Sequence, residues 1–578
     1  MLWDALTHWI RRGSDDRSPL EPVPDPVSAV MRARSSLPAE QLSSLVPLGL
    51  LEGSRGVPFL LTAREAQAHA LVLGKTGCGK TTWALTYARA LAERGTSIAC
   101  VSPHPDLDHG FLQIAAELGL PCVHIDFGGR SSLVTPFSFL SVEGVRPDEV
   151  AHLAQSLFAA TFGSGGAAGT IRSTLGPLFF VLASFPDELT LLDADRLVHD
   201  PAFAKRFVDR LDSPLPQVVS FFAALASKTK GSALQSTRFA LARIHALLAY
   251  RGVRLTLCGR PTVNLRTVIR TPTVIVVSIP AATLGDTAGL LAGLVVEHLR
   301  LILMQRTVPC SEPPFALFID ELGSLVAGAS RLGAFLAEAR KFKASLVGLT
   351  QSMTQLESNK RLHDAFMTNT NMLVLGRLGP HDANRFSGLP APSSQAETFK
   401  HDGLWVEGID ATWGNPAEPE RRQRHATQLA RALQDCPPRR FHVYASLKGN
   451  ACTARVRAFN LEANSRGAPQ LLGALPVARI ERALANAPSS PAPAPAVPQI
   501  LLTPPTQAPR APSPAPLVIT PTSRRPSTRK QPTSPPAPAR SPEPAAPPDP
   551  LPSEAAAPPP PPGATKSPMK PGDSVSRF

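Results

Sequence analysis

The chain has 578 residues and a formal net charge of +14, from 59 lysines and arginines against 45 aspartates and glutamates. Its seven cysteines are scattered without a C-x-x-C pair, which indicates neither a disulfide framework nor a zinc cluster and suits a reducing cytoplasm. No run of about 18 apolar residues occurs, so we expect no transmembrane segment.

Residues 1–66 are expected to form an N-terminal leader of short helices and turns, beginning with the amphipathic stretch MLWDALTHWIRR. From residue 67 to about 142 the chain alternates between apolar strands and amphipathic helices. The strands are expected at 70–74, 97–102 and 121–127, and the helices at 80–95 and 110–119. This alternation predicts an α/β fold with a parallel sheet, of which residues 67–142 form the first part.

Between about Ser141 and Arg251 nearly every segment has helical periodicity, so we expect an inserted all-α domain at 143–258. The α/β pattern then returns and continues over residues 259–461, with a closing hairpin around Gly449. Its strands are expected at 273–279, 315–320, 345–350 and 372–378, and its helices at 286–306 and 324–342.

The C-terminal part of the chain differs in composition. Residues 462–486 are expected to form a short helical segment, and residues 487–578 hold roughly half of the prolines. Phe578 is the only aromatic residue of this tail, which therefore has too little apolar surface to offset the entropy of ordering. We expect a disordered, proline-rich tail that carries about a third of the net charge, so the folded part is only moderately basic.

The segment GKTGCGKT at residues 74–81 matches the pattern G-x-x-x-x-G-K-[ST] between an apolar strand and a helix. Glycines in this pattern let backbone N–H groups face phosphates, and the helix N-terminus adds its positive end. Lys80 is expected to reach the β- and γ-phosphates, and Thr81 to hold Mg²⁺. The expected nucleotide-binding residues are Gly74, Lys75, Thr76, Gly77, Cys78, Gly79, Lys80, Thr81 and Thr82.

Two adjacent acids follow the apolar strand of FALFIDEL. Asp320 is expected to bind Mg²⁺, and Glu321 to orient and polarise the attacking water. An acidic helix N-cap after a buried strand is the alternative, because acids favour that position. Together with the phosphate-binding pattern, the paired carboxylates favour a hydrolytic motor over a small switch GTPase.

Two further residues follow in the segment LAEARKFKASLVGLTQSMTQL. Its strand ends at Gln351, a neutral amide that we expect beside the γ-phosphate. Arg340 lies one turn before the preceding helix ends, where it could face the nucleotide of a neighbouring subunit. It could equally complement the charge of the helix C-terminus, together with Lys341.

Several segments occur together in a fixed order over about residues 70–461. They are GKTGCGKTT, VSPHPDLDHG, SLVTPFSFL, FIDEL, EARKFKASLVGLTQS and NTNMLVLGRLGPHDANRFS. This combination resembles the HerA–FtsK superfamily of ring ATPases, and within it the conjugative coupling proteins and related ATPases of type IV secretion systems.

The resemblance implies a RecA-like P-loop core with an inserted all-α domain, a homo-hexameric ring, and ATP-driven movement of DNA through its channel. It implies ATP and Mg²⁺ as cofactors, and as partners non-sequence-specific DNA and proteins of the type IV secretion system or relaxosome. It places the chain in the cytoplasm, at the inner membrane only through a partner. Arg340 would act as an arginine finger in trans, with Arg377 as a weaker candidate for that role. Lys80, Thr81, Asp320, Glu321 and Gln351 would take the roles given above.

The sequence departs from the family in the turn that often reads Asp-Pro-His-Gly-Asp. Ser102 and Pro105 replace the acid and the glycine. The nearby side chains of His104, Asp106, Asp108 and His109 are a weak candidate metal cluster, and we favour a turn on the nucleotide side. The chain also lacks the N-terminal transmembrane helices that membrane-anchored coupling proteins carry.

Three classes of function remain open from the sequence, the second with two members. The leading hypothesis is a DNA-translocating ATPase of conjugative or type IV secretion transfer. Within the same superfamily, a secretion-channel ATPase that powers assembly or protein export without DNA, or a HerA-like DNA-processing helicase, is the alternative. The third is a binding module whose nucleotide pocket gates docking through the proline-rich tail.

Overall fold

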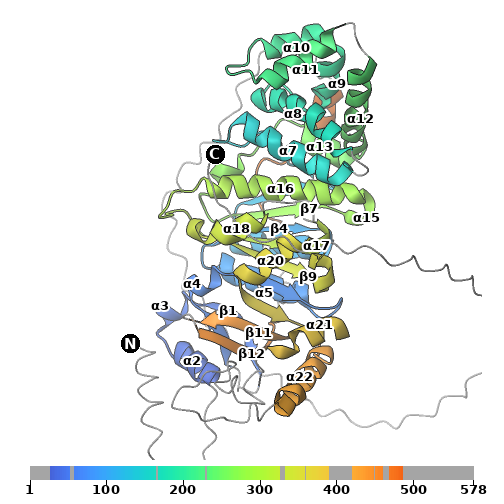
Figure 1. The fold of residues 1–578 in the computed structure, drawn as a ribbon. Coiled ribbons are helices and arrows are strands. Elements are labelled where there is room, and N and C mark those ends of the chain that lie inside the picture. Colours follow the sequence, from blue (N-terminus) through green and yellow to red (C-terminus); the bar gives the residue numbers. More distant parts are fainter. Residues whose placement is uncertain are drawn as a thin grey trace, which may run out of the picture. The chain divides into compact units, whose positions relative to one another are not determined.

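The computed structural model describes the chain in nine ranges. These are residues 26–52, 57–163, 167–227, 231–325, 332–357, 359–389, 419–447, 450–459 and 468–485. The N-terminal amphipathic stretch and the proline-rich tail expected at 487–578 lie outside these ranges. The statements below refer to the described residues (Figure 1).

An 11-stranded sheet has the strand order β2-β1-β12-β11-β10-β3-β9-β8-β4-β7-β5. In this order, each strand from β10 to β5 is parallel to its neighbours within that part of the sheet. Each strand from β2 to β10 is antiparallel to its neighbours within the other part. The strands are β1 Val46–Leu51, β2 Pro58–Leu61, β3 His69–Leu73, β4 Ser97–Ser102, β5 Cys122–Asp126, β7 Val274–Ser278, β8 Phe315–Ile319, β9 Ala344–Thr350, β10 Thr370–Leu375, β11 Arg440–Leu447 and β12 Asn450–Arg457. A separate two-stranded sheet pairs β6 (Leu133–Val134) with β13 (Leu475–Pro476).

Every residue of β3, β4, β8 and β9 is buried, because helices cover both faces of the parallel part of the sheet. Leu71 and Leu73 of β3 pack in one core with α16 (Asp286–Met304). Ala70 and Val72 pack in a second core with α5 (Lys80–Ala92) and α6 (Pro105–Leu118). The α/β class with a parallel sheet, expected from the strand–helix alternation, is therefore confirmed.

Helices fill the stretch between β6 and β7, as their periodicity predicts. They are α7 Pro147–Phe162, α8 Ala168–Ser184, α9 Ala194–His199, α10 Pro201–Val208, α11 Pro216–Ala226, α12 Gly231–Leu248, α13 Arg251–Cys258 and α14 Leu265–Val268. Asp200 ends α9 and caps α10, because its side chain accepts a hydrogen bond from the N–H of Phe203 and Pro201 occupies the first helical position.

The remaining helices are short or lie towards the two ends of the described chain. They are α2 Pro26–Ser35, α3 Ala39–Leu42, α4 Ala63–Ala66, α15 Ala281–Leu284, α17 Leu322–Leu325, α18 Leu332–Glu338, α19 Met353–Glu357, α20 Lys360–Asn369, α21 Pro380–Arg385, α22 Pro419–Gln434 and α23 Val477–Ala485. One helix was expected over 324–342. The described residues there form the end of α17, then α18, and last a 3₁₀ turn, η3 (Ala339–Phe342).

Among the described helices, α16 alone is long and apolar enough to cross a membrane, but 72% of its apolar window is buried inside the protein. Its apolar residues pack against the sheet and against α7. Its Glu297 is 1% exposed and pairs with Arg300, with the Nε and Oε2 atoms 2.5 Å apart. A helix buried in this way is a core helix, which agrees with the expected succession of a buried strand and a helix.

Residues 46–61 differ from the expectation of helices and turns alone. They form β1 and β2, which pair with each other and extend the main sheet through β12. Short apolar runs such as VPLGLL and PFLL fit a strand or a buried helix equally well. Their strand partner is supplied by residues about 400 positions later in the sequence, so local periodicity does not reveal it.

Candidate functional site

The phosphate-binding pattern forms the turn between β3 and α5. Gly77 and Gly79 have φ values of 77° and 99°, in the left-handed region that favours glycine. The Lys80 Nζ atom donates a hydrogen bond to the Gly74 carbonyl oxygen at 2.6 Å. The lysine side chain therefore folds back over the turn formed by residues 74–79. Cys78 is fully buried and its sulfur packs against Gly74.

This turn presents backbone donors that fit a phosphate group. Within the described chain, the N–H groups of Gly77 and Gly79 have no hydrogen-bond partner, and a Cβ atom added at Gly77 would meet nothing within 4 Å. The first N–H groups of α5, at Lys80 and Thr81, are unpaired as in any helix N-terminus. These N–H donors fit the oxygens of an anion, and the positive charge of Lys80 complements the negative charge of that anion.

The two acids expected to complete the site follow β8. Asp320 is 6% exposed, and its N–H donates to the Val101 carbonyl oxygen of β4 at 3.0 Å. Burial raises the pKa of Asp320 and the charge of Glu321 adds to this, whereas His104, the N–H of Glu321 and the charge of Lys80 oppose it. Lys80 and Asp320 therefore lie close enough to interact, as a shared Mg²⁺ and phosphate site requires.

Glu321 itself has a φ of 49°, an uncommon value for a residue other than glycine. Its N–H donates to the Asp320 Oδ1 atom at 3.0 Å, which helps to fix the orientation of the Asp320 carboxylate. A residue kept in the left-handed region indicates that the surrounding structure specifies its position closely. The hydroxyl of Thr81 and the carboxylate of Asp320 are the oxygen donors that Mg²⁺ prefers, so the residues present fit this cation.

Strand β9 lies between β3 and β8, which places its last residue between the phosphate-binding turn and the two acids. The Thr76 hydroxyl donates to the Gln351 Oε1 atom at 3.3 Å. The Gln351 Nε2 atom donates to the Glu321 Oε1 atom at 2.5 Å. A continuous chain of side-chain hydrogen bonds therefore joins the phosphate-binding turn to the acid expected to activate water.

Gln351 and the residues beside it are also held by side chains that the sequence analysis did not single out. The Gln355 Oε1 atom accepts hydrogen bonds from the Thr350 hydroxyl at 2.7 Å and from the Gln351 N–H at 3.3 Å. The buried Asp382 carboxylate accepts the N–H of Met353 at 3.4 Å, which caps the start of α19. Asp382 follows β10, which is separated from β9 by β3 in the sheet, so a residue from a third strand end holds the segment after Gln351.

His104 is a second residue near the acids. Its Nε2 atom lies 4.0 Å from the Glu321 Oε1 atom, at the end of β4, the strand next to β8. The Ser102 hydroxyl accepts the His104 N–H at 3.0 Å and thereby fixes the turn. The turn thus lies beside the acids, as the nucleotide-side interpretation expects. No group of three or more His, Cys, Asp or Glu side chains in the described residues could hold a metal ion.

Asp108 belongs to a buried polar group beside these residues, and its carboxyl should make the free energy of unfolding depend on pH. Burial raises its pKa to about 7, and the charges of Asp126 and Asp320 add to the shift, whereas a hydrogen bond with Ser278 opposes it. In the unfolded chain this carboxyl ionises near pH 3.8. Between pH 3.8 and 7 the folded state therefore holds a proton that the unfolded state releases, and the free energy of unfolding falls as the pH rises.

We expect Asp108→Asn to stabilise the protein at pH 8 by up to about 4 kcal/mol, and to have little effect at pH 4, because asparagine removes the cost of burying the charge. Thermal unfolding at both pH values measures this difference. Asp106→Asn, at an exposed position two residues earlier, is the matched control. An equal effect of Asp108→Asn at the two pH values would contradict the proposed cause.

Arg340 is not brought to this site. Arg340 lies in η3, directly before β9 begins, whereas the phosphate-binding turn comes directly after β3 ends. Because β3 and β9 are parallel, Arg340 and the turn lie at opposite edges of the sheet. Arg340 is exposed, and its charge reaches His69, the first residue of β3. Burial lowers the pKa of His69 to about 4, and Arg340 contributes in the same direction. Arg340 therefore contacts no part of its own chain's phosphate-binding turn.

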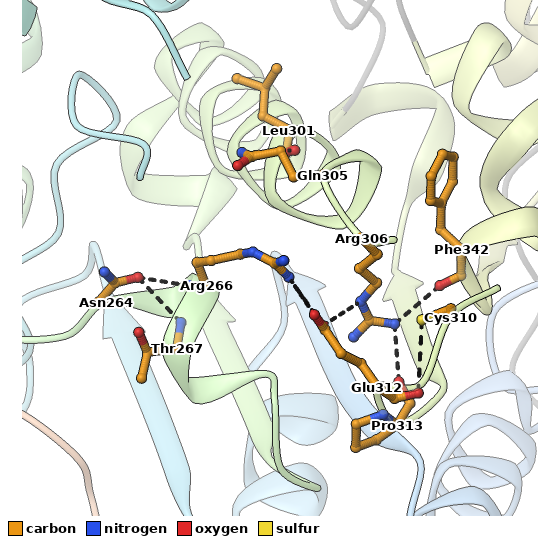
Figure 2. Close-up of polar contacts among 10 residues, drawn as sticks. All are labelled: Asn264, Arg266, Thr267, Leu301, Gln305, Arg306, Cys310, Glu312, Pro313 and Phe342. Carbon is orange, nitrogen blue, oxygen red and sulfur yellow. Dashed lines mark hydrogen bonds and ion pairs between the residues drawn. The ribbon is translucent and has the colours of Figure 1, made fainter. Parts of the chain in front are cut away.

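A cluster of charged side chains fixes the turn that carries Arg340 (Figure 2). The Arg306 Nη1 atom donates to the carbonyl oxygen of Phe342, the last residue of η3, at 3.1 Å. The Glu312 carboxylate pairs with the Arg306 Nε atom at 3.1 Å and with the Arg266 Nη1 atom at 2.9 Å. Arg306 is 3% exposed, so these contacts hold η3 firmly against the loop before β8.

Two later segments of the chain flank the phosphate-binding turn on the side away from β9. The Lys75 N–H donates to the carbonyl oxygen of Arg377, which follows β10, at 2.8 Å. Arg377 therefore lies beside its own chain's turn. The N–H of Arg439, at the start of β11, donates to the Cys78 carbonyl oxygen at 2.8 Å. Nothing in the local sequence marks Arg439, because its contact joins residues far apart in the chain.

No protein-family model and no curated protein matches the chain. A structure of the bacterial conjugative coupling protein TrwBdeltaN70, unbound monoclinic form, aligns with a TM-score of 0.50 and 16% identity, over 77% of this chain and 93% of that chain. This chain shares its fold with a conjugative coupling protein. The plasmid coupling protein TrwB in complex with ADP and Mg²⁺ gives a TM-score of 0.46, 16% identity, and coverage of 72% and 91%. The structure of VirB4 of Thermoanaerobacter pseudethanolicus aligns with a TM-score of 0.46 and 14% identity, over 72% of this chain and 97% of that chain.

The coupling-protein fold confirms the RecA-like α/β architecture that the motifs imply. At 16% identity the likeness concerns the fold alone, so the roles of individual residues must be argued from the geometry of this chain.

Proposed function

We propose that this chain is an ATPase that translocates DNA in conjugative or type IV secretion transfer, and that it hydrolyses ATP at the subunit interfaces of a ring. The observation that carries the proposal is the hydrogen-bonded connection from Thr76 through Gln351 to Glu321. It unites a phosphate-binding turn and a candidate base on a fold shared with a coupling protein.

In this proposal the residues of the turn, from Gly74 to Thr82, bind the phosphates of ATP through their backbone N–H groups. Lys80 neutralises charge on the β- and γ-phosphates, and Thr81 and Asp320 hold Mg²⁺. Magnesium, when bound, would stabilise the charge that develops on the phosphate oxygens. Glu321 orients the attacking water and accepts its proton, and Gln351 positions Glu321 relative to the terminal phosphate.

The interfacial part of the proposal concerns Arg340. An exposed arginine at the edge opposite its own chain's phosphate-binding turn is available to the turn of a neighbouring copy in a head-to-tail ring. The cluster around Arg306 would then present this guanidinium in a fixed position. We propose a homo-hexamer with one nucleotide site at each interface, an all-α domain at 143–258 and a tail that leaves the core after residue 486.

The proposed substrate is DNA held through its phosphates, without sequence preference. The formal charge of +14 is compatible with such a polyanionic partner. The seven cysteines are all free and buried, which supports work in a reducing cytoplasm. Contact with the inner membrane would be made through proteins of the secretion system or relaxosome.

We expect DNA to stimulate ATP hydrolysis by the full-length protein, and the stimulation to fall as the salt concentration rises, because phosphate contacts release counterions. The measurement is steady-state ATPase activity with saturating single- or double-stranded DNA at two salt concentrations. Lys80→Ala should abolish activity in every condition. Hydrolysis that is equally fast with and without DNA would contradict translocation and favour the secretion-channel ATPase that powers protein export.

A further inference from the structure

The helices α7–α13 (residues 147–258), which we call the helical insertion, have two connections to the sheet that meet beside the end of α16. On the entry side, a Cβ atom added at Gly144 would collide with Gln305, the residue directly after α16. On the exit side, the Asn264 side chain caps α14 and also donates a hydrogen bond to Glu143 of the entry connection. The base of the insertion is therefore packed against the last turn of α16.

A single carboxylate, that of Glu312, joins the exit connection to the end of α16. The Arg266 Nη1 atom of α14 donates to both Glu312 carboxylate oxygens, at 2.9 and 3.0 Å (Figure 2). The Arg306 Nε atom lies 3.1 Å from the Glu312 Oε2 atom. In the described part of the chain Glu312 is the only acid that pairs with Arg306, whose side chain is fully buried. Removal of this carboxylate would leave a buried positive charge without compensation.

The buried guanidinium of Arg306 also contacts η3. Its Nη1 atom donates to the carbonyl oxygens of Phe342, at 3.1 Å, and of Pro313, at 3.0 Å. Phe342 ends η3, and the Lys343 N–H after it donates to the Arg340 carbonyl oxygen at 3.2 Å. Printed polar contacts therefore run without a break from α14, through one carboxylate and one guanidinium, to the backbone turn that carries the exposed arginine.

We infer that Glu312 is a positioning residue for ATP hydrolysis at the neighbouring subunit, and that its pair with Arg266 lets the helical insertion set the position of Arg340. The inference rests on the arginine acting in trans, as proposed above, and adds the element that controls it. A guanidinium stabilises transferred phosphate only when it is correctly placed, so a displaced η3 lowers the rate of hydrolysis. Movement of the insertion relative to the sheet would change that rate without any contact with nucleotide.

The first measurement is amide hydrogen exchange in the full-length protein. Arg266→Met cuts the contact with α14 and leaves the pair of Glu312 with Arg306 in place, so the variant should fold. We expect the amides of residues 339–343 to exchange about tenfold faster in this variant, and those of residues 80–92 in α5 to exchange as in the wild type. Arg266→Lys keeps the charge and should restore part of the protection.

The second measurement locates the effect within the ring. Lys80→Ala subunits keep the arginine and Arg340→Ala subunits keep the phosphate-binding turn, so a mixture should regain activity where the two meet. Introduced into the Lys80→Ala subunits, Arg266→Met should lower the regained rate about fivefold, and Glu312→Gln about twentyfold because it breaks both ion pairs. Introduced into the Arg340→Ala subunits, either substitution should leave the regained rate unchanged.

Arg251→Met is the matched control, because it removes the 2.7 Å ion pair between the same helical insertion and Glu481 of α23. It should change neither the exchange of residues 339–343 nor the regained rate. If Arg266→Met leaves that exchange as in the wild type, or lowers the rate equally in both kinds of subunit, the control of Arg340 by the insertion is wrong. If the starting mixture regains no activity, the proposed interfacial site is wrong, and this inference with it.

Discussion

Replacing Glu321 by glutamine is expected to lower the kcat for ATP hydrolysis about a thousandfold while nucleotide affinity stays close to that of the wild type. Glutamine keeps the size of the side chain and an oxygen that can accept the hydrogen bond of Gln351. It cannot take a proton from water. The change therefore removes the base and leaves the connection between the acids and the phosphate-binding turn in place.

Single-turnover hydrolysis together with equilibrium binding of ATP separates the two effects. Lys80→Ala is the contrasting variant, because it should weaken binding as well as hydrolysis. Gln351→Ala, which removes the amide that contacts Glu321, should lower kcat to a smaller extent. A Glu321→Gln variant with an almost normal kcat would show that another group activates the water, and His104, 4.0 Å from Glu321, would be the next candidate.

The sequence predicted the parts of the fold and of the site that depend on short-range patterns. Strand β3, the glycine turn and α5 follow one another within 24 residues, and each has a recognisable local signal. The acids after β8 and the amide after β9 were predicted for the same reason, since each ends an apolar strand. The strand order then brings these ends together, because parallel strands place their carboxyl ends at one edge of the sheet.

The remaining features depend on contacts between distant parts of the chain. Arg439 contacts Cys78, which lies far earlier in the sequence, and β1 pairs with β12. Neither contact has a local signature, because an exposed arginine and a short apolar run occur in many environments. Asp382 lies in the first turn of α21, where acids are common, yet its carboxylate accepts the N–H of Met353 and caps a different helix, α19.

Replacing Arg340 by alanine is expected to lower kcat about a thousandfold without changing the affinity of a single subunit for ATP. The reason is that an arginine supplied by a neighbouring subunit stabilises the phosphoryl group during its transfer. The residue lies at the opposite edge from its own turn, so the loss should appear only in the assembled protein. Lys341→Ala, at the next exposed position of η3, is the control and should leave the rate close to that of the wild type.

Mixing two inactive variants separates an action in trans from a structural role. An Arg340→Ala subunit has an intact phosphate-binding turn, and a Lys80→Ala subunit has an intact arginine. In an equimolar mixed ring about a quarter of the interfaces combine both, so the mixture should regain about a quarter of the wild-type rate. An arginine that only completes the helix end of its own subunit would give no recovery, because every subunit in the mixture would still carry its own defect.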